Sequence, residues 1–160
     1  MKRDNERGGE IVPLRTIPSA RRAAIEAGHH ARMMASIANA ETREARKREL
    51  WGPIGSGSME RLCALFHSLD GVPGTRPWDA MVLLKWLCTS PGVSHGSSHA
   101  AKFVLRVWNS YTNWDEAAHE EKLLKKSEHI KPFDMFEALA CWDGGNAAAF
   151  RAWVEVPFWP

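Results

Sequence analysis

The aromatic residues of this chain all lie on one side of a single position, and this limits where a core can form. All eight tryptophans, all six phenylalanines and the single tyrosine lie at or after Trp51. Aromatic side chains bury large areas and dominate the energetics of cores. The sequence therefore predicts a core built from residues 51–160. Residues 1–50 carry eleven Lys and Arg against seven Asp and Glu, so this part of the chain is basic.

The basic part predicts one long helix from Ser19 to about Leu50. Ser19 is a favourable N-cap residue, and no proline interrupts the run that follows. A face of small residues buries little area by itself, so we expect this helix to need a partner surface. Residues 1–18 contain two prolines and are predicted to be an irregular lead. The stripe along the helix consists of Ala20, Ala24, Ala27, Ala31, Met34, Ala38 and Ala45, at steps of three or four residues or their multiples.

The aromatic part predicts several short helices. Runs such as MERLCALFHSL and HAAKFVLRVWNS place apolar residues on one helical face, and no run alternates with the period of a strand. The predicted fold class is all-α, a bundle of five or six short helices preceded by one long basic helical arm. Five tryptophans fall on predicted helices and are expected in the core: Trp78, Trp86, Trp108, Trp142 and Trp153.

A Gly-Ser-Gly-Ser stretch marks the boundary between the two parts. The predicted organisation is an arm over residues 1–54, a flexible hinge or linker over residues 55–58, and a Trp-rich bundle over residues 59–160. The stretch is either a natural hinge, in which Ser58 caps the next helix, or an engineered linker followed by the initiator Met59. Both interpretations place a boundary here.

Composition limits the compartment. The apolar run from Ala80 to Cys88 is too short to span a bilayer and contains Lys85. The charged N-terminus lacks the apolar stretch of a secretory signal. The three cysteines are odd in number and widely separated, which is not typical of a disulfide framework. We therefore expect a cytoplasmic protein without a membrane association.

No strong catalytic signature is present in the sequence. The sequence has no nucleophile-elbow, phosphate-loop or dinucleotide-binding motif. Cys63 and His67 are one helical turn apart, but Cys63 lies on the apolar side of its helix, so a buried structural thiol is expected. Asp134 and Glu137 are interpreted as first-turn acids of a helix. We predict a protein that is not an enzyme, with no cofactor and no small-molecule substrate.

A metal site drawn from Cys88, His95 and His99 is incomplete. Their spacing is C-x6-H-x3-H, whereas structural zinc usually takes four ligands. No second cysteine lies nearby, and the fold would have to supply Cys141. The sequence does not predict this site, although it leaves open whether His95 and His99 bind metal.

Two groups of residues are candidate contacts with a partner. Phe158 and Trp159 lie between two prolines, where they either fold back as a plug or form an exposed aromatic anchor. Electrostatic contacts with a partner or with nucleic acid are predicted for Arg21, Arg22, Arg43, Arg46, Lys47 and Arg48.

The function predicted from these features is a non-enzymatic binding subunit, adaptor or inhibitor that docks on a larger protein or nucleoprotein assembly. The alternative is a sequence-nonspecific DNA- or RNA-binding protein, whose basic N-terminal helix lies along phosphates. Glu41, Glu44 and Glu49 are interleaved with the arginines, which is typical of an ordinary solvated helix face and weakens the alternative.

Overall fold

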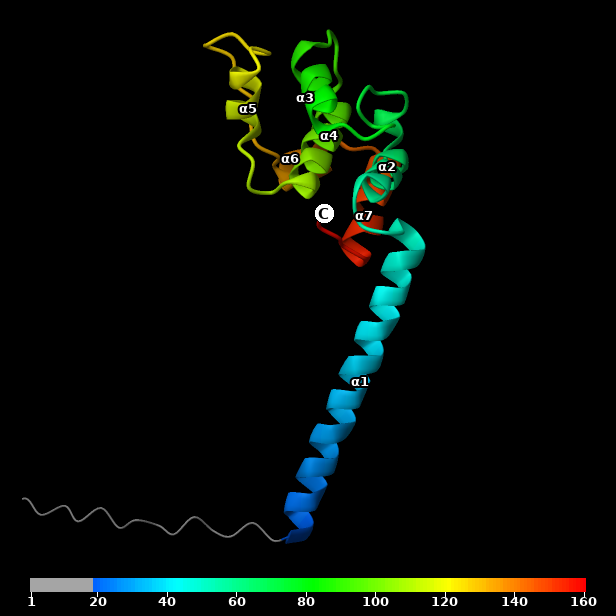
Figure 1. The fold of residues 1–160 in the computed structure, drawn as a ribbon. Coiled ribbons are helices and arrows are strands. Elements are labelled where there is room, and N and C mark those ends of the chain that lie inside the picture. The colour runs from blue at the N-terminus through cyan, green and yellow to red at the C-terminus, as the bar shows by residue number, and fades with distance from the viewer. Residues whose placement is uncertain (1–18) are drawn as a thin grey trace, which may run out of the picture. The chain divides into compact units, whose positions relative to one another are not determined.

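The computed structural model describes residues 19–160, with side chains described from residue 24 onward. Within this range the chain is helical and has no named strand, which confirms the all-α class. Residues 1–18, predicted to be irregular, lie outside the described residues. The helices are α1 (Ser19–Trp51), α2 (Ser56–Leu65), the 3-10 helix η1 (His67–Leu69), α3 (Ala80–Thr89), α4 (His95–Trp108), α5 (Trp114–Glu120), α6 (Met135–Cys141) and α7 (Gly144–Glu155), labelled in Figure 1. None of the helices in residues 19–160 is long and apolar enough to cross a membrane.

The chain divides into two compact units, Met1–Glu41 and Thr42–Pro160. The described part of the first unit is the helical stretch 19–41 of α1. From Ala24 to Glu41 every residue is exposed except Gly28, which is partly buried. The long helix predicted from Ser19 is therefore present, and it ends at Trp51.

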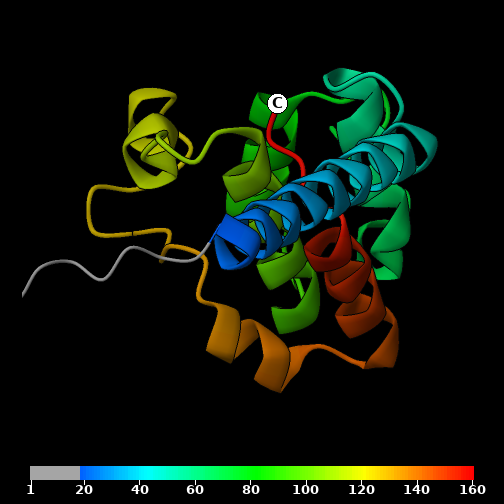
Figure 2. The same cartoon turned by 90° about the horizontal axis from the view of Figure 1, so that it is seen from below.

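The second unit is organised around α4. This helix contacts α2, α3, α6 and η1, while α2 also contacts α7 and α3 contacts α5. Figure 1 and Figure 2 both show α7 beside α2. Ser94 caps α4, because its side chain accepts a hydrogen bond from the backbone N–H of Ser97. The buried residues of α4 are His99, Ala100, Ala101, Phe103, Val104, Leu105 and Val107.

Phe103 is the centre of an aromatic cluster in this unit. Its ring centroid lies 5.2 Å from those of Phe150 and Trp153, both in T-shaped arrangements. Such edge-to-face pairs add to the stabilisation that burial alone provides. The predicted Trp-rich core is confirmed: Trp78 and Trp142 are buried, and the partly buried Trp86, Trp108 and Trp153 pack against the core.

The C-terminal tail folds back onto the end of α1. Phe158 is 0% exposed, and its ring centroid lies 4.9 Å from that of Trp51. Of the two sequence interpretations of the tail, the plug therefore holds for Phe158, and this residue does not stand on the surface as an anchor. Trp159 is 55% exposed and packs edge-to-face on Trp153, so it is the exposed member of the pair.

The Gly-Ser stretch at residues 55–58 leads directly into α2. The N-cap is Gly55, and Ser58 is the third helical residue instead of the cap that the sequence predicts. The Ser58 hydroxyl is buried, donates to the carbonyl of Gly55 over 2.7 Å and accepts from the N–H of Gly55 over 3.0 Å. These bonds tie the serine to the residue that starts the helix. The flexibility of residues 55–58, and the domain division drawn there, stay predictions.

Candidate functional site

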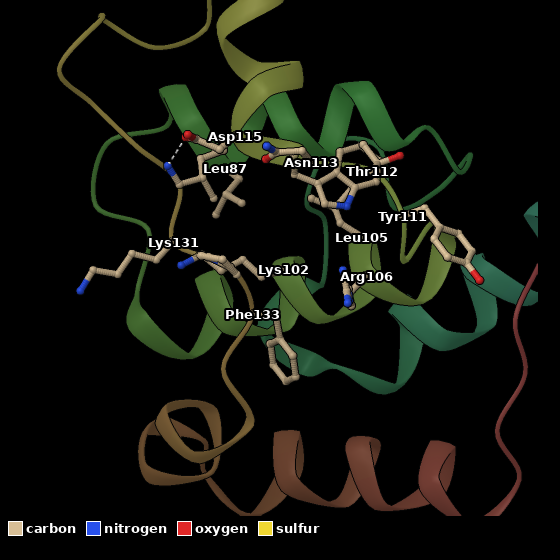
Figure 3. A pocket seen from close by; sticks show the side chains of 13 residues that line it. Leu87, Lys102, Leu105, Arg106, Tyr111, Thr112, Asn113, Asp115, Lys131 and Phe133 are labelled. Atoms are coloured by element: carbon tan, nitrogen blue, oxygen red, sulfur yellow. Dashed lines mark hydrogen bonds between the residues drawn. The ribbon is translucent and has the colours of Figure 1, made fainter.

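A pocket of about 470 Å³ lies beside α4 in the second unit. Its wall combines residues of α3 and α4 with the stretch 111–115, which runs into the start of α5, and with the connecting segment 130–133. Figure 3 shows the side chains that line it, with Lys102 and Arg106 both coming from α4. The full lining is Leu87, Lys102, Leu105, Arg106, Tyr111, Thr112, Asn113, Trp114, Asp115, Ile130, Lys131, Pro132 and Phe133.

The charged side chains that line the pocket are mostly cationic. They are Lys102, Arg106 and Lys131, against the single carboxylate of Asp115. Burial lowers the pKa of Lys102, Glu137 opposes this effect, and the positive charge of Lys131 adds to it. The guanidinium of Arg106 donates to the carbonyl of Ser110, which holds it at the start of the lining segment. Together with the aromatic rings of the wall, these cations make the pocket suited to an anionic group.

A cluster of one aspartate and two histidines lies at the edge of this pocket. Asp115 and His119 are four residues apart on α5, and His129 comes from the segment that follows the helix. The Asp115 carboxylate lies 3.0 Å from His129 Nδ1 and 3.9 Å from His119 Nε2. One ligand atom from each residue lies within 4.8 Å of the other two. The histidine rings form an edge-to-face pair, with their centroids 5.4 Å apart.

Asp115 is the member of the cluster whose side chain is fixed most firmly by hydrogen bonds. Its Oδ1 accepts a 2.7 Å hydrogen bond from the backbone N–H of Ile130, the bond drawn as a dashed line in Figure 3. The hydrogen bond to His129 lowers the pKa of Asp115, and the Ile130 N–H lowers it further, whereas desolvation opposes both effects. Asp115 is therefore a carboxylate under ordinary conditions.

One ring nitrogen of His119, Nε2, lacks a hydrogen-bond partner among the described residues. This nitrogen is buried. The nearest carboxylate oxygen, at 3.9 Å, is too far away for a hydrogen bond. Buried polar atoms normally have a partner, so an orphan such as this one needs a physical explanation.

The sequence prediction drew attention to other histidines. His95 and His99 lie in the first turns of α4, and Cys88 lies near the end of α3. The metal-competent group in the described part of the chain is Asp115 with His119 and His129, and it contains none of these three residues. The spacing D-x3-H in WDEAAHEE was a usable signal, because positions four apart share a helix face. His129 could not be found in this way, since the chain must turn back after α5 to bring it near.

The predicted basic contacts fall into three groups. The side chains of Arg21 and Arg22 lie outside the described residues. Arg43 and Arg48 are exposed on α1. Two others form ion pairs: Arg46 bonds Glu155 over 3.1 Å, and the partly buried Lys47 lies 4.0 Å from Glu44. Acidic neighbours thus partly neutralise the basic cluster at the end of α1.

No protein-family model, curated protein or solved structure matches this chain. Its residues and their geometry are therefore the basis for a functional proposal.

Proposed function

We propose that the protein is a non-enzymatic binding subunit, an adaptor or inhibitor, that docks on a larger protein assembly through α1. The observation that supports this proposal is the exposure of large apolar side chains on the first unit. Met33 is 53% exposed, Met34 50% and Ile37 45%. Single exposed apolar residues are ordinary on a protein surface, but three within five positions of one helix form a patch that a partner can cover.

The stability of the helix gives a second reason to expect a partner. Most helices in proteins are stabilised by packing one face against other elements, and isolated helices are marginal in water. Between Ala24 and Arg46 every residue of α1 is exposed apart from Gly28. Full burial of a large apolar side chain stabilises by roughly 1.5–3 kcal/mol, so covering the half-exposed patch would contribute a few kcal/mol. Methionine suits such a contact, because its flexible side chain adapts to the shape of a partner.

The charge pattern favours a protein partner over direct phosphate binding. Residues 24–50 carry five basic side chains and four glutamates, which leaves little net charge on the described part of the helix. Binding along a phosphate backbone depends on a surplus of cations that displaces counterions. The alternative of sequence-nonspecific DNA or RNA binding through this helix rests on the exposed Arg43 and Arg48, together with Arg21, Arg22 and Arg32.

In this proposal the remaining sequence predictions have defined roles. The arm up to residue 54 engages the partner through its exposed stretch before Lys47, while residues 55–58 as the hinge and residues 59–160 as the Trp-rich bundle keep the bounds expected from the sequence. Trp159, half-exposed at the C-terminus, is the aromatic anchor that remains available. A cytoplasmic location is part of the proposal, and the three cysteines, all free in the structure, are compatible with a reducing compartment.

The test is a pull-down from source-cell lysate with the full chain as bait, after nuclease treatment. Three baits are compared: the unchanged chain, the double variant Met33→Glu with Ile37→Glu, and the control Asn39→Glu, which places a charge on the other side of the same helix. We expect one stoichiometric protein that the unchanged chain and the control retain and the double variant loses. Equal retention by all three baits would contradict docking through this patch, and partners that nuclease releases would favour the nucleic-acid alternative.

A further inference from the structure

We infer that Asp115, His119 and His129 form a binding site for a divalent transition metal, with Zn²⁺ as the best fit. Two imidazole nitrogens and one carboxylate are a ligand set that Zn²⁺ uses commonly. The nitrogen ligands argue against Mg²⁺ and Ca²⁺, which prefer oxygen throughout. This inference rests on the second unit alone and is independent of the docking proposed for α1.

The distances are close to those a metal requires. In tetrahedral zinc sites with bonds near 2.1 Å, neighbouring ligand atoms lie about 3.4 Å apart. Here the Asp115 carboxylate is 3.0 Å from His129 Nδ1 and 3.9 Å from His119 Nε2, and all three ligand atoms lie within 4.8 Å of one another. Small side-chain rotations would bring all three ligand atoms within bonding distance of one metal ion. The imidazole of His129 has the freedom to make them, because this side chain is 66% exposed.

The surroundings of the cluster support metal binding independently of the distances. The Asp115 carboxylate is oriented by the backbone N–H of Ile130, the type of outer hydrogen bond that metal-binding carboxylates usually have. The buried Nε2 of His119 has no hydrogen-bond partner among the described residues and points towards the same carboxylate. A metal ion between the three residues would bind the lone pair of His119 Nε2 and so give this buried atom a partner.

The position of the site indicates what the metal would do. Asp115 and His119 belong to α5, whereas His129 lies beyond the turns that follow this helix. A metal bound here would fasten the 121–130 segment to the helix. Three protein ligands also leave one coordination position for water or an anionic ligand, and the cationic pocket begins at Asp115 and Ile130. The segment that the metal would fasten therefore forms part of the pocket wall.

The test uses the intact purified chain, stripped of metal with a chelator and dialysed against increasing Zn²⁺. We expect one equivalent to bind saturably. Co²⁺ serves as a spectroscopic probe, because imidazole and carboxylate coordination in tetrahedral geometry gives strong visible absorption. His129→Ala is the first variant, since an exposed side chain can be removed with little risk to folding. His67→Ala is the matched control, because His67 is also exposed and lies 2.9 Å from a single aspartate, Asp143.

Loss of a residue that only supports a metal ligand lowers metal affinity roughly tenfold to hundredfold. His129→Ala removes a ligand itself, so we expect its affinity for the metal to fall by at least that factor. The affinity of His67→Ala should be unchanged. Asp115→Asn is a second variant that keeps an oxygen acceptor for the Ile130 N–H, and it should also lose the Co²⁺ absorption while retaining the helical circular dichroism. The inference is overturned if no saturable equivalent binds. It is also overturned if both variants bind as the unchanged chain does, which would assign the metal to other histidines, such as His29 and His30 of α1.

Discussion

The indole N–H of Trp51 donates a 2.7 Å hydrogen bond to the carbonyl of Val156, a residue 105 positions further along the chain. Trp51 is the last residue of α1 and is only 2% exposed. Its ring also packs on Phe158. The C-terminal tail and the end of the long helix therefore stabilise each other within the second unit.

Replacing Trp51 with phenylalanine should destabilise the second unit. The variant keeps an aromatic ring but leaves the Val156 carbonyl without its donor, and an unsatisfied buried group costs about 1–3 kcal/mol. Urea unfolding followed by far-UV circular dichroism measures the change. Trp159→Phe is the control, because Trp159 is half-exposed, and its free energy of unfolding should change by less than about 0.5 kcal/mol. Equal shifts in the two variants would show that the buried hydrogen bond contributes nothing specific.

Gly74→Ala should be far more destabilising than Gly71→Ala. Both glycines have positive φ, +84° and +69°, which costs a non-glycine residue roughly 1–2 kcal/mol. At Gly74 an added Cβ would also lie 2.6 Å from the Asp79 carbonyl and collide with the backbone N of Leu83, whereas at Gly71 it meets open space. Thermal unfolding should show a loss above about 3 kcal/mol for Gly74→Ala and only the conformational cost for Gly71→Ala. Similar losses would contradict the close approach at Gly74.

The three cysteines should differ sharply in reactivity. Burial raises the pKa of the Cys63 thiol to about 12, and it also raises the pKa of the partly buried Cys88. Cys141 is exposed. Because the thiolate is the nucleophile, alkylation at pH 8 should label Cys141 first and leave Cys63 unlabelled until urea unfolds the chain. Mass spectrometry of peptides from timed samples follows each site. Early labelling of Cys63 would mean that α2 opens far more readily than its burial indicates.

Acid should weaken the start of α7. Asp143 caps this helix, and the N–H of Asn146 lowers the pKa of its carboxyl below the ordinary 3.8, with a further contribution from the His67 charge. A lowered pKa in the folded state stabilises the fold above pH 3.8, and this contribution is lost as the pH falls below that value. Asp143→Ala should therefore be less stable at pH 6 and should lose less stability as the pH falls from about 4 to about 2, the range below the ordinary pKa of the carboxyl.

The control for this prediction is Asp143→Asn, which keeps the capping oxygen but not the charge. It should retain most of the stability at pH 6 while sharing the flatter pH profile. Urea midpoints at several pH values test both variants. A pH profile of Asp143→Ala that is as steep as that of the unchanged chain would assign the acid sensitivity to other carboxylates.

The parts of the fold that local patterns control could be predicted from the sequence. The long helix from Ser19 and the burial of Cys63 each depend on residues within a few positions, and the structure contains both. Ser94, Ser97 and Ser98 all have the side chain of a good N-cap, and the structure uses Ser94 to start α4. Local patterns therefore establish a helix better than they establish its first residue.

The parts that depend on distant contacts could not be predicted in the same way. The sequence left open whether Phe158 is a plug or an anchor, because its burial depends on Trp51 more than a hundred residues away. The cluster at Asp115 was missed for a similar reason. The spacing of Asp115 and His119 is visible in the sequence, but His129 comes near them through the turn after α5, where the Ile130 N–H bonds back to Asp115. The cationic pocket likewise joins α4 to segments that follow it in the chain.

The most direct test of the central claim, docking through α1, is amide hydrogen exchange of the intact chain with and without the protein partner recovered by pull-down. In the free chain the amides of residues 24–46 should exchange quickly, because an exposed single helix opens readily. In the complex the amides around Met33, Met34 and Ile37 should become at least about tenfold more protected. Unchanged exchange across this stretch, together with new protection confined to residues 59–160, would contradict the proposal and assign the interface to the Trp-rich bundle.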